Sequence, residues 1–124
     1  MALKFYSLIF VILFTGCFNH PKISKSVVVI FKTPIFKFYD RGFITKYDSK
    51  IHLQIYNAGQ VGLNLIIYKN RVCQSTFECM EAKEFNKKYL SSDYSDDFLY
   101  KLFNKNKVYF KDKKNKIFIK VKND

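Results

Sequence analysis

The sequence has few of the residues from which catalytic sites are built. Its 124 residues include two histidines, three cysteines and no tryptophan, and they contain no G-x-S-x-G, no H-E-x-x-H and no phosphate-cradling glycine loop. A hydrolytic site needs a nucleophile beside a base and an orienting partner. His52 shares a predicted strand face with Gln54 and Tyr56, and we expect a solvent-facing or hydrogen-bonded histidine there. The sequence therefore predicts neither enzymatic activity nor a cofactor.

Glycine, proline and acidic residues are also scarce. Four glycines and two prolines exclude a collagen-like chain, and a composition of 48% hydrophobic and 26% charged residues predicts a folded core in one domain. The chain has 10 acidic and 22 basic residues, which gives it a net charge of +12. Such an excess suggests an anionic partner, or simply a solvated surface.

The basic excess consists almost entirely of lysine. Twenty of the 22 basic residues are Lys, and only Arg41 and Arg71 are Arg. Base-specific recognition of nucleic acid favours arginine and defined motifs, so no nucleic-acid partner is expected. An AT-rich genome explains the bias equally well. Attraction to anionic lipid headgroups remains a second explanation.

The N-terminus has the pattern of a targeting segment. An apolar run over residues 5–14 is too short for a spanning helix, which needs about 20 residues, and it is followed by Thr15, Gly16 and Cys17. An ordinary secretory peptide or a short anchor helix is the alternative.

The end of this run resembles the bacterial lipobox, in which a small residue precedes a cysteine that is acylated and becomes the new N-terminus. The resemblance implies a signal peptide over residues 1–16, a lipidated Cys17 with a tether over 17–26, and a single domain over 27–124. The lipobox-like residues, together with a mature region rich in Lys, Phe, Ile and Asn, resemble those of small lipoproteins of the Campylobacter and Helicobacter group. Phe18 stands where Asp would favour inner-membrane retention, so the resemblance implies an outer-membrane lipoprotein.

The cysteine count agrees with an exported protein. Assigning Cys17 to the lipid leaves Cys73 and Cys79, which we predict to form a structural disulfide in an oxidising compartment. A redox couple would be expected to have C-x-x-C spacing, and a metal site would be expected to have histidine nearby.

The hydropathy pattern predicts an α+β fold. Strands are expected over 27–31, 35–47, 51–56 and 61–68, with a kink or bulge near Arg41 and Gly42. Helical spacing follows over 82–90 and 98–103, and a hairpin over 108–110 and 117–121 ends the chain. The result is an antiparallel β-meander, with a half-open barrel as the alternative form of the sheet, together with two short helices and a C-terminal β-hairpin.

Acidic residues are concentrated between residues 78 and 97, a segment that contains six Asp or Glu residues and three lysines. Asp93, Asp96 and Asp97 lack the spacing and the glycine of a calcium loop. We therefore interpret them as the cap of the second helix.

The order of these elements is similar to the LolA/LolB class of lipoprotein carriers, which are unclosed β-barrels whose apolar concave face holds acyl chains. That resemblance implies a ligand groove, for which the candidates opposite the main core set are Phe36, Phe38, Phe43, Ile66 and Phe118. Packing beneath the helices is the alternative for the same residues.

Together these features predict a non-enzymatic lipoprotein anchored to the outer membrane. Its domain is expected to bind an envelope lipid, an acyl chain or an envelope protein. The alternative is an interaction module without a small ligand, built as an immunoglobulin-like β-sandwich.

Overall fold

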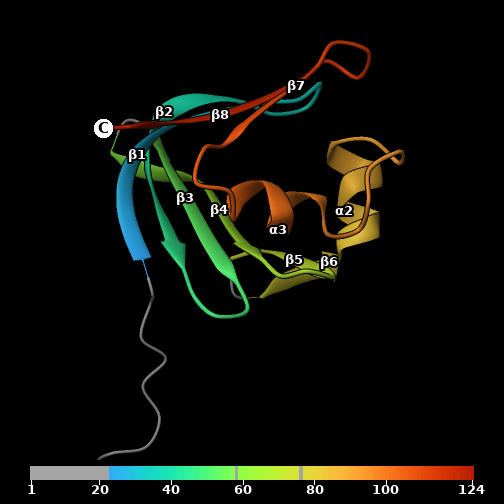
Figure 1. The fold of residues 1–124 in the computed structure, drawn as a ribbon, viewed down its shortest axis with the longest axis horizontal. Coiled ribbons are helices and arrows are strands. Elements are labelled where there is room, and N and C mark those ends of the chain that lie inside the picture. Colours follow the sequence, from blue (N-terminus) through green and yellow to red (C-terminus); the bar gives the residue numbers. More distant parts are fainter. Residues whose placement is uncertain (1–22, 58, 76) are drawn as a thin grey trace, which may run out of the picture.

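The computed structural model describes residues 23–57, 59–75 and 77–124, which form one eight-stranded antiparallel sheet with two helices (Figure 1). The strands lie in the order β6-β5-β4-β3-β2-β1-β8-β7. Their bounds are β1 Ile23–Lys32, β2 Lys37–Lys46, β3 Ile51–Asn57, β4 Gln60–Ile67, β5 Arg71–Gln74, β6 Glu78–Glu81, β7 Tyr109–Asp112 and β8 Ile117–Asn123. The helices are α2, Ala82–Tyr89, and α3, Phe98–Phe103.

This architecture confirms the predicted α+β class, with its meander, two short helices and C-terminal hairpin. The described strands form a single sheet instead of two packed sheets, so the immunoglobulin-like sandwich does not describe this domain. The C-terminal hairpin joins the meander because β8 pairs with β1, from Val27 opposite Asn123 to Lys32 opposite Phe118.

One face of the sheet carries the core. Directly paired residues share a face, and the apolar residues of successive strands meet there: Val29 and Phe31 in β1, Leu53 in β3, Leu65 in β4. We call this the inner face, and the opposite side the outer face. The largest fully buried side chains are Phe31, Phe85, Phe103, Ile51, Leu53, Ile55, Leu65, Ile67, Ile117, Ile119, Val27 and Val29.

Both helices cover the inner face. The sheet curves around α3, and α2 lies at the open side of the curve near β5 and β6 (Figure 1). The Phe103 ring of α3 stacks on Phe31 with 6.3 Å between the ring centroids. The buried Asn86 of α2 donates from its side-chain amide to the carbonyl oxygen of Ser95 at 2.8 Å and so holds the connection between the helices.

An aromatic cluster holds the start of α3 against the last hairpin. Tyr94 and Phe98 lie 4.5 Å apart by ring centroid, and both contact Phe110. The Tyr94 hydroxyl donates to Asp112 at 2.5 Å. This hydrogen bond is the largest cause of the lowered pKa of the Asp112 carboxyl, so the contact is strongest when Asp112 is ionised.

The structure differs from the sequence prediction at the start of the domain. β1 begins at Ile23, which pairs with Lys46, whereas the prediction ended the tether at residue 26. The short side chains of Ser24 and Ser26 hid the strand pattern. At α3, Asp97 occupies the predicted cap position without a side-chain cap bond. Its carboxylate instead contacts Lys101 at 3.2 Å and accepts from Ser95.

Gly42 keeps β2 and β3 close together. The β2 register runs without a shift through Arg41 and Gly42, so no bulge lies there; the register shift is at Ile55 and Tyr56. A Cβ at position 42 would lie 2.1 Å from the Gln54 carbonyl oxygen. Glycine is needed here for close backbone approach.

The predicted disulfide is confirmed. Cys73 and Cys79 are directly opposite each other in β5 and β6, and they are bonded. Cys17 and the predicted signal peptide lie outside the described residues. Among the residues that are described, no helix is long and apolar enough to cross a membrane.

Gly42→Ala is expected to destabilise the domain by about 1–3 kcal/mol, because the added methyl group must push the β3 backbone away. Chemical denaturation monitored by circular dichroism measures the change. Gly62→Ala is the matched control, since its Cβ would lie 3.2 Å from the nearest atom, the Asn57 Cβ. Equal stability of the two variants would contradict this account of Gly42.

Candidate functional site

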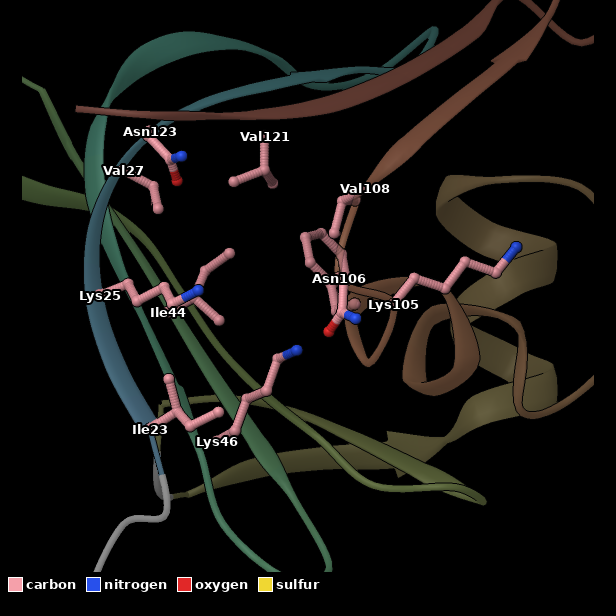
Figure 2. Close-up of a pocket in the computed structure, with 11 residues that line it drawn as sticks. Ile23, Lys25, Val27, Ile44, Lys46, Lys105, Asn106, Val108, Val121 and Asn123 are labelled. Atoms are coloured by element: carbon pink, nitrogen blue, oxygen red, sulfur yellow. The ribbon is translucent and has the colours of Figure 1, made fainter.

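A small pocket opens on the inner face where β1 begins and β2 ends (Figure 2). Its volume is about 80 Å³. We call it the lysine pocket. Its lining residues are Ile23, Lys25, Val27, Ile44, Lys46, Phe103, Lys105, Asn106, Val108, Val121 and Asn123.

The register of β1 and β2 places two lysines at this pocket. Ile23 pairs with Lys46, and Lys25 pairs with Ile44, so all four side chains share the inner face. Figure 2 shows the side chains of Lys25 and Lys46 extending toward the space between the strands and the segment after α3, whereas the ammonium of Lys105 points away. Two positive charges therefore converge over an apolar floor.

The opposite wall comes from the segment that follows α3. Phe103 and Val108 are buried, and the Val121 amide donates to the Val108 carbonyl oxygen at 3.1 Å. This hydrogen bond ties the segment to β8. The position of the wall thus depends on the packing of α3 on the sheet.

The pocket disfavours the charged form of Lys46. Burial lowers the pKa of the Lys46 ammonium below its ordinary value of 10.5, and the charge of Lys25 lowers it further. The described lining residues include no carboxylate. An anion placed between the two ammonium groups would relieve both effects.

A second hollow lies elsewhere on the inner face, where β2 begins and β5 ends. It is an open groove of about 380 Å³. The Phe36 and Phe38 rings, 6.0 Å apart by centroid, form its apolar side. Its other lining residues are Val61, Gly62, Leu63, Asn64, Gln74, Ser75 and Glu78. Phe36 also stacks on Tyr89 of α2 at 4.7 Å, so it is part of the packing as well as the groove.

The five residues predicted for a ligand groove divide between the two faces of the sheet. Phe36 and Phe38 pack against the core cluster of the inner face. Phe43 pairs with Gln54, Ile66 with Cys73, and Phe118 with Lys32, all on the outer face. The prediction placed all five side chains opposite the core. Phe38 and Phe43 are an odd number of residues apart, so they could share a face only if β2 had a bulge between them. The register of β2 is continuous there, so the two side chains lie on opposite faces.

The histidine considered in the sequence, His52, lines neither hollow. His52 is half-buried on the outer face, where its Nε2 is hydrogen-bonded to the Asn64 side chain. Within residues 23–57, 59–75 and 77–124, no group of three or more His, Cys, Asp or Glu side chains is arranged to hold a metal ion.

Sequence reasoning missed Lys25 and Lys46. Lys25 fell within the predicted tether, and Lys46 was one of many lysines. A signal did exist, because continuing the β1 alternation back to Ile23 would have put Lys25 on the same face as Val27. That Lys25 and Lys46 lie together could not be predicted, because it depends on the register in which Ile23 pairs with Lys46 and Lys25 pairs with Ile44.

Comparison of the chain with protein-family models, with curated proteins and with solved structures gave no match.

Replacing Lys25 with Gln is expected to raise the pKa of Lys46, because it removes the charge contribution and leaves only burial. NMR titration of the Lys46 side chain measures the shift. Lys105→Gln, whose ammonium points away, should leave the Lys46 pKa unchanged. A pKa that does not respond to Lys25→Gln would show that the two charges do not meet.

The same pKa has a consequence for stability. A lysine whose pKa is lower in the folded state than in the unfolded state destabilises the fold while it is protonated. That cost is present at neutral pH and disappears as the pH rises from the lowered pKa to the ordinary value.

Proposed function

We propose that this chain is a non-enzymatic lipoprotein of the bacterial envelope, anchored to the outer membrane through Cys17, and that its domain binds the anionic headgroup of an envelope lipid in the lysine pocket. The observation that carries the ligand assignment is the convergence of Lys25 and Lys46 over an apolar floor. The anchor is supported by the lipobox-like residues that end at Cys17.

The chemistry of the pocket suits a phosphate or carboxylate with an apolar remainder. An ammonium attracts either anion as a point charge, and a partly buried pair of opposite charges interacts more strongly than an exposed pair. Ile23 and Val121 line the same pocket and offer apolar surface to the first methylenes of a lipid.

The size of the pocket favours a headgroup over an acyl chain. Its volume of about 80 Å³ is roughly half that of the ~150 Å³ engineered cavity that admits benzene. The centre of the inner face is filled by the core between the two hollows. We therefore propose that the acyl chains of the ligand stay outside the domain.

The pocket lies a few residues along the chain from the proposed lipid anchor, which suits a ligand in the same membrane. Ile23 lines the pocket, and it is the sixth residue after Cys17. Six residues span at most about 20 Å, at ~3.3–3.6 Å each. A lipidated Cys17 would keep the pocket close to the headgroups of the anchoring leaflet.

The anchor can be tested by expressing the full chain in a Gram-negative host and weighing the mature protein from membranes. We expect an N-terminus at Cys17 that carries acyl chains, and loss of both the acyl mass and the membrane fraction in Cys17→Ala. The double variant Cys73→Ala/Cys79→Ala should keep the acyl mass. An unmodified N-terminus would refute the anchor.

The ligand can be tested on the detergent-solubilised mature protein by native mass spectrometry with added phosphatidylglycerol. Lys25→Gln/Lys46→Gln should reduce the bound fraction by about fivefold or more, as expected for two charge contacts at ~0.5–1 kcal/mol each. Lys83→Gln/Lys87→Gln removes the same charge from the exposed side of α2 and should bind like the unchanged chain. Equal binding of phosphatidylcholine would argue against headgroup recognition.

A further inference from the structure

The outer face of four adjacent strands carries a regular lattice of cations and aromatic rings. Paired residues across β7, β8, β1 and β2 form rows on this face. The first row is Lys111, Phe118, Lys32 and Lys37; the second is Tyr109, Lys120, Ile30 and Tyr39; the third is Lys122, Val28 and Arg41. We call these three rows the outer basic face.

This lattice holds six cations, and the described register places no carboxylate in its rows. Lys32 and Lys37 are directly opposite each other, an arrangement of like charges that destabilises a sheet. Asp124 lies beyond the third row, where its carboxylate is 3.6 Å from Arg41. Packing gives no reason to gather these charges, whereas binding an anion does.

Aromatic rings support three of the ammonium groups. Lys111 lies 6.0 Å from the centroid of Phe118, Lys120 lies 5.8 Å from that of Tyr109, and Lys122 lies 5.6 Å from that of Tyr39. These distances are within cation–π range. Tyr39 and Tyr109 remain 57% and 50% exposed, so each ring can also contact a partner.

The chemistry of the face favours a glycan polymer over a nucleic acid. Single-stranded nucleic acid stacks its bases on open ring faces, but here the lysines lie over them. Five of the six cations are lysines, whereas arginine is the residue that nucleic-acid recognition favours. A half-exposed tyrosine offers an apolar edge and a hydroxyl, which match the C–H groups and hydroxyls of a sugar.

The orientation of the domain also separates this face from the anchoring membrane. The lysine pocket and the outer basic face lie on opposite sides of the sheet. The first two rows contain Lys32 and Ile30, near the far end of β1 from Ile23, about 23–30 Å away at ~3.3 Å per residue. A domain that uses the pocket at its anchoring leaflet therefore places the first two rows away from that leaflet.

We propose that the outer basic face binds a carboxylate-bearing glycan polymer of the envelope, with the lysines contacting the carboxylates and the two tyrosines contacting the sugars. This adds a second binding site to the proposed function. The choice of a glycan rests on the proposed envelope location, while the outer basic face itself is independent of the lysine pocket.

The test is co-sedimentation of the detergent-solubilised mature protein with peptidoglycan sacculi, whose peptides carry carboxylates. Lys32→Gln/Lys111→Gln/Lys120→Gln is expected to weaken binding about tenfold or more and to reduce its salt dependence. Lys83→Gln/Lys87→Gln/Lys88→Gln on α2 removes the same charge and should change binding less than twofold. Circular dichroism melts verify that both variants fold.

Tyr39→Ala/Tyr109→Ala keeps every charge and is expected to weaken binding about threefold or more. Wild-type binding by this variant would overturn the glycan assignment, as would tighter binding of oligothymidylate than of sacculi at the same face. Equal losses for the two lysine variants would show that net charge alone acts and would also overturn the proposal. Acylation of Cys17 and lipid binding by the lysine pocket are measured in separate experiments. The sedimentation results can therefore be interpreted even if either of those two proposals fails.

Discussion

The packing of α3 on the inner face holds the sheet, the core and the lysine pocket in their arrangement. A single sheet must cover one face to bury its apolar side chains, and here two short helices and their connections provide that cover. Phe103 stacks on Phe31, and the chain then turns back through Val108 into the last hairpin. The same contact therefore closes the core and sets the wall of the lysine pocket.

The strict alternation of the strands gives the two faces different chemistry. Gly42 lets β2 and β3 pair without a bulge, so inner and outer positions never exchange along β2. Lysines at inner positions reach the edge of the core, where burial penalises their charge. Three lysines at outer positions lie over aromatic rings. The seven lysines in β1, β2, β7 and β8 are thus sorted by register onto two faces that point in opposite directions.

Local patterns in the sequence predicted much of the fold. The hairpin of β3 and β4, both helices, the last hairpin and the Cys73–Cys79 disulfide were all predicted, because each depends on periodicity or spacing within a short segment. The groove was predicted less well. Phe43, Ile66 and Phe118 lie opposite the core as predicted. Phe36 and Phe38 instead pack against the core, because β2 lacks the irregularity expected near Gly42 that would have exchanged its two faces.

Short-range hydropathy and turn residues specify the α+β class and the order of elements, and cysteine spacing specifies the disulfide, so all three follow from the sequence alone. It also contains the lipobox-like residues on which the proposed anchor rests. The pairing of β8 with β1, across some 90 residues of sequence, becomes visible only in the folded domain. That pairing brings Lys111, Phe118, Lys32 and Lys37 into one row, and long-range register cannot be read from local periodicity.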